Sequence, residues 1–181
     1  GIVIRERYFL GLPCEILSMR SEDRQRSILV AHKYPTSNGA RYSIYDATQK
    51  PLKLIASLRG NKKKRTFTLS LLNPRVVSMI IKYIGKKRTK ERNFTVQLPV
   101  SSVRNNTELL KAQKPNHNGY YGRAKMSSIK NCLLTNKTNE LVFIFGKVDK
   151  TLHRCFINSP LSLVESFALC CASTNSGSFQ F

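Results

Sequence analysis

Short runs of alternating hydrophobic and polar residues dominate the chain, and such runs predict β-strands. In the segment 52–59, Leu52, Leu54, Ala56 and Leu58 fall on one face, while Lys53, Ile55, Ser57 and Arg59 fall on the other. A continuous apolar run, Leu141 to Phe145, is typical of a strand in a crowded interior. The predicted strands lie at residues 28–34, 41–46, 52–59, 66–71, 94–98 and 141–145.

Two segments have the signals of helices. In the first, Asn73 is placed as an N-cap with Pro74 at the first helical position, which predicts a helix over 75–84 ended by Gly85. The second, Leu161 to Ser173, follows Ser159-Pro160 and is apolar on nearly all sides, so we expect it inside a core. The polar stretch Asn105 to Asn118 predicts a loop.

Many short strands, few helices and a last helix too apolar for exposure together predict a barrel closed around a helix. The fold class expected is therefore mainly β with a buried helix. The length of 181 residues fits one domain with a sizeable core, and we expect residues 1–181 to form it.

Charge sets this chain apart from an ordinary globular protein. It has 31 Lys and Arg against 10 Asp and Glu, a formal net charge of +21, and the excess is concentrated. Between Lys50 and Arg92 only Glu91 is acidic, and the densest clusters are 62–65 and 86–92, on either side of the first predicted helix. Charge repulsion within the chain opposes compaction, so the excess indicates an anionic partner. The alternative is that the clusters are solvated loops of a basic, soluble protein.

The predicted strand, basic loop and helix start place several cations near one another. Arg59 ends the strand, Lys62, Lys63 and Lys64 follow, and Arg75 lies in the first helical turn. A helix N-terminus and an arginine fork both suit a phosphate group. The candidate site for a phosphorylated head group thus comprises Arg59, Arg75 and the lysine loop, with Arg41 as a further candidate.

Catalytic chemistry has no support in the sequence. The three histidines, His32, His117 and His153, lack neighbours at metal-ligand spacing, and no nucleophile, phosphate-loop or dinucleotide motif occurs. We expect no enzyme, no metal and no cofactor. The five cysteines form no paired motif, which favours free thiols and a reducing compartment. No secretion signal is expected at residues 1–7, and no stretch approaches the ~20 apolar residues of a membrane span.

Three blocks in the last third of the chain resemble the end of the tubby C-terminal domain. They are Tyr121 to Cys132, Phe143 to Val148 and Ser159 to Cys170, in the family's order and at similar spacing. Upstream, Leu29 to Lys33, Ile55 to Asn61 and Thr66 to Thr68 are similar to shorter family segments. The resemblance implies a closed antiparallel barrel of about twelve strands with Leu161 to Ser173 as its central helix.

The same resemblance implies binding of phosphatidylinositol 4,5-bisphosphate by a monomeric, membrane-tethered adaptor in membrane-protein or ciliary trafficking. The expected location is cytoplasmic, at the inner leaflet of the plasma membrane, with the cilium or nucleus as further sites. Arg59 matches a phosphate-contacting family arginine and Arg75 corresponds to a second, but Ser57 stands where the family has a lysine. That departure leaves the preferred phosphoinositide open, with Lys53 or Lys62 to Lys64 as substitutes for the missing charge.

Two other functions stay open at this point. A net charge of +21 suits nucleic acid equally well, and the family has been linked to transcription. Scramblases share the expected barrel, although no lipidation motif or span supports that reading.

Overall fold

The computed structural model gives the structure of most of the chain. The residues it describes are 1–7, 13–21, 23, 25–37, 39–62, 65–73, 75–83, 94–100, 106–113, 120–126, 128 and 130–175.

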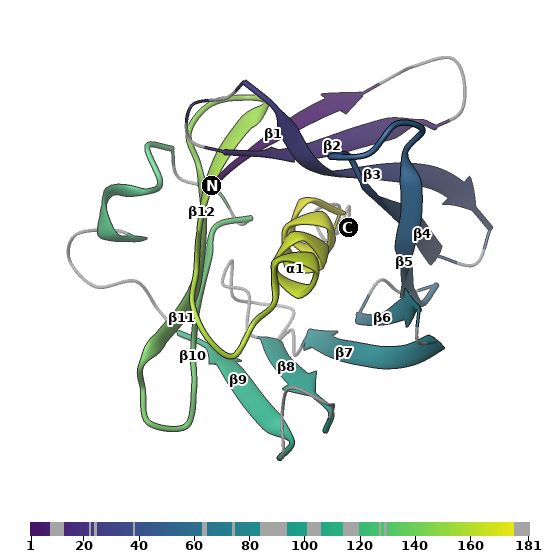
Figure 1. The fold of residues 1–181 in the computed structure, drawn as a ribbon. Coiled ribbons are helices and arrows are strands. Elements are labelled where there is room, and N and C mark those ends of the chain that lie inside the picture. Colours follow the sequence, from purple (N-terminus) through teal and green to yellow (C-terminus); the bar gives the residue numbers. More distant parts are fainter. Residues whose placement is uncertain are drawn as a thin grey trace.

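Twelve antiparallel strands in the described residues close into a barrel (Figure 1). Each strand pairs with its neighbours in sequence, and β1 pairs with β12 to close the sheet, so the order is a simple meander. Closure removes the unpaired edges of an open sheet. The strands are β1 (Ile2–Arg7), β2 (Glu15–Arg20), β3 (Ser27–Thr36), β4 (Gly39–Asp46), β5 (Lys53–Gly60), β6 (Thr66–Leu72), β7 (Arg75–Tyr83), β8 (Phe94–Leu98), β9 (Glu108–Ala112), β10 (Cys132–Thr135), β11 (Leu141–Lys147) and β12 (Leu152–Ile157).

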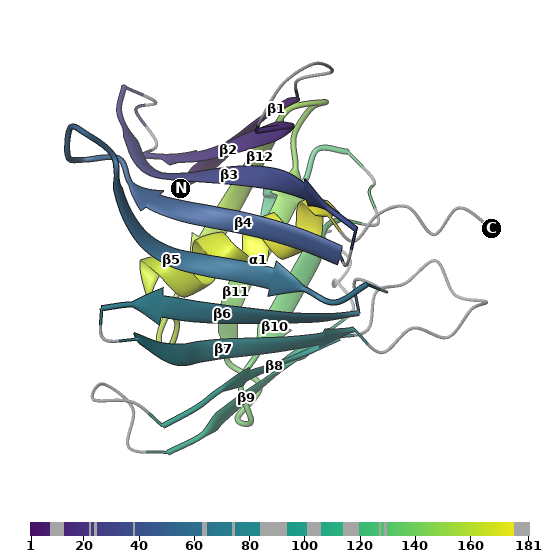
Figure 2. The ribbon, with the colours of Figure 1, turned by 90° about the vertical axis from the view of Figure 1, so that its right-hand side faces the viewer.

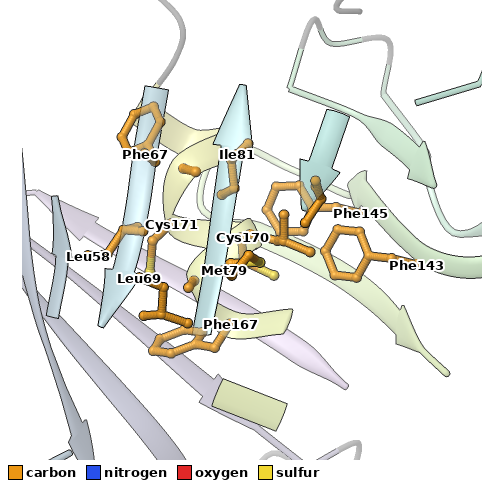
Figure 3. Packing of buried hydrophobic residues seen from close by; sticks show 14 of the residues in the cluster. Leu58, Phe67, Leu69, Met79, Ile81, Phe143, Phe145, Phe167, Cys170 and Cys171 are labelled. Carbon is orange, nitrogen blue, oxygen red and sulfur yellow. The ribbon is translucent and has the colours of Figure 1, made fainter. Parts of the chain in front are cut away.

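Helix α1 (Leu163–Asn175) runs through the middle of the barrel (Figures 1 and 2). Phe167, Cys170 and Cys171 on the helix are buried against inward side chains of the strands, such as Leu69 and Phe145 (Figure 3). The predicted barrel around an apolar C-terminal helix is therefore confirmed, with the helix beginning two residues later than the sequence indicated. A short 3₁₀ turn, η1 (Tyr120–Gly122), lies outside the barrel beside β11.

The start of α1 is fixed by a capping box. The Ser162 amide donates to Glu165 Oε2 at 2.9 Å, and the Glu165 amide donates to Ser162 Oγ at 3.3 Å. Ser78 Oγ on β7 donates to the other oxygen, Glu165 Oε1, and both residues are buried. The cap therefore also ties the helix to the barrel wall.

The first predicted helix is wrong: Arg75–Tyr83 is strand β7, paired along both sides with β6 and β8. Met79 and Ile81 point into the core, while the residue that follows each of them, Ile80 and Lys82, does not. That is a period of two, and the β-branched residues of this segment suit a strand. Asn73 lies in the turn after β6, and Pro74, Ile84 and Gly85 are outside the described residues.

Two further expectations need correction. The predicted loop Asn105 to Asn118 contains strand β9, which pairs with β8 and β10 and buries Leu110. In β5, a bulge between Leu54 and Ala56 shifts the alternation. Only Ala56 and Leu58 of the predicted apolar face are buried, while Leu52 and Leu54 are 43% and 44% exposed.

The antiparallel meander gives the barrel two distinct ends, seen side-on in Figure 2. The turns between β4 and β5 and between β6 and β7 lie at the end where α1 begins. The turns between β3 and β4 and between β5 and β6 lie at the end where α1 finishes. These are called the α1 N-terminal end and the α1 C-terminal end below.

Candidate functional site

Two arginines face each other across neighbouring strands near the α1 C-terminal end. Arg41 on β4 and Arg59 on β5 are register partners, and both are exposed. The residues beside them, Tyr42 and Leu58, are fully buried, so the arginines project outward. Directly opposed residues of an antiparallel pair have Cα atoms about 4.5–5.5 Å apart. The guanidinium groups of two arginines opposed in this way can bind one phosphate together.

This pair has unfavourable electrostatics in the free protein. Like charges directly opposite across strands destabilise a sheet. Among the described residues, the ion pairs formed by arginines involve Arg5 and Arg7 with Glu15, and no carboxylate neutralises Arg41 or Arg59. A bound anion would relieve this repulsion, which is the property expected of an anion-binding site.

Further cations extend this surface. Lys62 is exposed in the turn after β5, where the Asn61 side chain accepts hydrogen bonds from the amides of Arg65 (2.8 Å) and Thr66 (3.3 Å). Lys82 on β7 is exposed and pairs with Thr66. Arg41, Arg59, Lys62 and Lys82 together are called the basic face. The predicted residues Lys63 and Lys64 lie outside the described residues.

Ser57 belongs to a row of hydroxyl groups beside the arginine pair. It is half-buried and pairs with Ser43 on β4 and Ser70 on β6. Ser57 shares the outward side of β5 with Arg59, two residues away. The position can therefore donate a hydrogen bond to an anion held by the arginines, but it adds no charge.

Arg75 and Lys53 do not join this group. Arg75 pairs with Leu72, whereas Arg59 pairs with Thr68, four residues away along β6. At ~3.3 Å per residue this separates them by roughly 13 Å along the strand, besides the lateral distance. Lys53 lies at the far end of β5, opposite Asp46. The structure thus splits the predicted set between the two ends, and with β7 a strand there is no helix N-terminus at Arg75.

Lys82 is the residue that sequence reasoning missed. The expected helix over 75–84 hid its place on the outward side of a strand. The β-branched residues Val76, Val77, Ile80 and Ile81 were the available signal of a strand.

The two histidines in the described residues, His32 and His153, pack against aromatic rings. The His32 ring contacts the Tyr45 ring at a tilt of 50°, with centroids 4.9 Å apart, and His153 stacks on Phe145, with centroids 4.7 Å apart. Burial lowers the pKa of His32, and burial together with Lys130, Arg5 and Lys147 lowers the pKa of His153 to about 4. His117 is outside the described residues.

Possible metal ligands and thiols complete the ionisable groups in the part of the chain that the structure describes. Within it, no group of three His, Cys, Asp or Glu residues is placed to hold a metal ion. All five cysteines are free, and burial raises the pKa of Cys170 and Cys171 well above the usual value, which keeps them as thiols. No helix among these residues is both long and apolar enough to cross a membrane.

Two of the three blocks that carried the family resemblance, Tyr121 to Cys132 and Phe143 to Val148, meet on the opposite side of the barrel. The Asn131 side chain accepts from the Lys147 amide at 2.8 Å and donates to the Met126 carbonyl at 2.9 Å. The amides of Lys125 and Met126 donate to the Lys147 carbonyl, at 2.9 and 3.1 Å. A Cβ on Gly146 would lie 2.7 Å from the backbone of Arg123, so only glycine permits this contact. We call Arg123, Met126, Asn131, Gly146 and Lys147 the signature cluster.

Fold and site define a closed β-barrel around a central helix with a cationic outer surface. The model of the Tub family matches residues 117–176 of this chain. The match confirms the resemblance to the tubby C-terminal domain, and the barrel around α1 agrees with it. Among curated proteins, no match to the chain was found.

Proposed function

We propose that the chain is a phosphoinositide-binding module that attaches to anionic membranes through the basic face. The observation that carries this proposal is the outward pair Arg41 and Arg59, opposed in register and without a neutralising carboxylate among the described residues. A phosphate monoester accepts bidentate hydrogen bonds from such a pair. Beside it, Lys62 and Lys82 of the basic face supply further attraction, at about 1 kcal/mol per cation near an anionic leaflet.

Ser57 shapes the expected specificity. The hydroxyl row lies beside the arginine pair and can donate to phosphate oxygens, but it adds no cation. We therefore propose that the head group is recognised chiefly by the arginines, with weaker discrimination among bisphosphate isomers than a lysine at Ser57 would give.

The resemblance to the tubby C-terminal domain supports a wider role. We propose a tethering or adaptor role at the inner leaflet of the plasma membrane, with membrane-protein cargo or trafficking machinery as partners and no catalytic activity.

Flotation with phosphatidylcholine vesicles tests the proposal. Separate preparations would contain phosphatidylserine, or one of the phosphoinositide isomers at a matched total charge. We expect stronger binding to the phosphoinositide vesicles than to phosphatidylserine, and competition by soluble inositol phosphates. Equal binding at equal charge would refute a head-group site, and absence of binding would refute the membrane role.

Nucleic acid is the second candidate, favoured by the net charge of +21. Backbone binding of this kind weakens steeply with salt. If it were the function, duplex DNA would bind with a steep salt dependence, and soluble inositol phosphates would compete only by ionic strength.

A further inference from the structure

Exposed apolar side chains gather at the α1 N-terminal end of strands β5 to β7. Each is between 38% and 45% exposed, although large aliphatic side chains are usually buried. They lie in the turn before β5, at the start of β5, at the end of β6 and at the start of β7, which are adjacent in the sheet (Figure 2). We call them the apolar edge: Leu52, Leu54, Leu72, Val76 and Val77. Leu163, the first residue of α1, is 41% exposed at the same end.

Two bulges turn part of the apolar edge away from the core. The bulge between Leu54 and Ala56 pairs Leu54 with Tyr45 and leaves it exposed. A second bulge, at Ser78, gives both Ser78 and Met79 to the interior and leaves Val77 exposed opposite Ser70. The exposed parts of these side chains therefore contribute nothing to the packing of the core. Contiguous exposed apolar surface of this kind marks an interaction site.

Cations flank the apolar edge. Lys50, Lys53 and Arg75 are all exposed beside it. Among the described residues, Asp46 is the partly exposed carboxylate near the apolar edge. Its pKa is lowered, mainly by a hydrogen bond from the Thr48 side chain. The other side of the same barrel end is polar instead, with a depression lined by Asn106, Glu108 and Glu140 among others. Apolar residues among cations match the boundary between head groups and acyl chains of an anionic bilayer.

Leu54, Leu72 and Val77 of the apolar edge lie on the same outer surface of the sheet as the basic face. Leu54 and Arg59 belong to the same strand, five residues or about 16 Å apart. A barrel lying on strands β4 to β7 therefore brings both to one membrane plane.

We infer that the apolar edge inserts into the membrane while the basic face holds the phosphorylated head group. This inference rests on the proposed function and adds the orientation of the barrel, with β4 to β7 against the bilayer and the signature cluster facing away.

Tryptophan depth measurement tests the inference, because the chain contains no tryptophan. Val77→Trp places the probe in the apolar edge. Tyr121→Trp, at a position 54% exposed in η1 beside β11, is the matched control. The vesicles would be phosphatidylcholine with a small fraction of phosphatidylinositol 4,5-bisphosphate, with or without bromine on the acyl chains. We expect a blue shift and bromine quenching for Val77→Trp and neither for Tyr121→Trp.

A second variant measures the contribution to affinity. Leu54→Ser with Leu72→Ser changes exposed residues without changing charge, and we expect about tenfold weaker vesicle binding with the isomer preference retained. If vesicles bind but neither tryptophan is quenched and the serine variant binds normally, the insertion is wrong and the head-group site stands. If no vesicle binds in flotation, the proposed function and the insertion fall together.

Discussion

The signature cluster and the basic face lie on different sides of the barrel and differ in what their residues do. In the signature cluster, Asn131 is buried and joins two backbone segments, and Gly146 admits the chain at Arg123. In the basic face, Arg41 and Arg59 are exposed, and no ion pair occupies them within the described residues. The first set of residues holds the fold, whereas the second is available to a ligand.

This difference decides what the family match means. The matched segment, 117–176, contains the signature cluster and α1 but no residue of the basic face. The residues of the signature cluster are constrained by packing and backbone hydrogen bonds, so the match in this segment supports the barrel. Evidence for a ligand must come instead from Arg41, Arg59 and their neighbours.

The largest expected effect is on the stability of the fold, from a change in the signature cluster. Gly146→Val puts a side chain where a Cβ already lies 2.7 Å from the Arg123 backbone. Displacing that segment also weakens the two amide bonds to the Lys147 carbonyl. We expect a loss of about 3 kcal/mol or more in the free energy of unfolding, measured by urea denaturation. A urea unfolding curve equal to that of the unchanged protein would show that the close contact is not required.

Glu165→Ala removes the capping box and leaves Ser78 without this acceptor. Glu165 is 1% exposed and binds the Ser162 amide, so we expect a loss of about 2 kcal/mol. Ser162→Ala is the matched control, since it removes one half of the box but keeps the carboxylate; about half the loss is expected. Equal losses for the two variants would contradict a separate role for the link between Glu165 and β7.

His153 predicts a defined pH dependence of stability. Its pKa is about 4 in the folded protein, below the ordinary value of 6.5, so the unfolded chain binds the proton more readily. The associated stability is therefore complete above pH 6.5 and is lost as the pH falls toward 4. Between pH 7 and pH 5 the loss is about 2 kcal/mol. His153→Phe retains a ring against Phe145 and should remove this part of the slope; an unchanged slope would exclude His153 as its source.

The smallest expected effect is on vesicle binding, from a change beside the arginine pair of the basic face. Ser57→Lys adds a cation next to the arginine pair, and we expect roughly fivefold tighter binding to phosphoinositide vesicles. Thr107→Lys, exposed before β9, adds the same charge elsewhere. If both variants tighten binding equally, the basic face acts through net charge, and the arginine pair loses its special role.

The sequence predicted much of the fold because its strongest signals were local. All six predicted strands are present, and the apolar helix was recognised because a helix apolar on all sides must be buried. The strands that were missed include β2, whose inward residue Glu15 is charged. Glu15 becomes acceptable in the barrel because Arg5, on the neighbouring strand, lies 2.6 Å away. Such long-range compensation leaves no trace in a local pattern.

The candidate site was only partly predictable, for a related reason. Arg59 and Arg41 could be placed on outward positions of predicted strands, but their direct opposition depends on the register of β4 and β5. Arg75 was assigned to the same site because Asn73-Pro74 imitates a helix start. Pairing with β6 and β8 overrides that local signal and moves Arg75 to the other end.

The central claim is that the arginine pair binds the ligand and contributes little to the fold. Its most direct test compares Arg41→Ala/Arg59→Ala with Lys137→Ala/Lys150→Ala, which removes the same charge from exposed turns across the barrel. Flotation with phosphoinositide vesicles and thermal unfolding would be measured for both. We predict at least tenfold weaker binding for the arginine variant only, about 1.4 kcal/mol, with both melting temperatures close to that of the unchanged protein. Equal loss of binding in the two variants would contradict the claim.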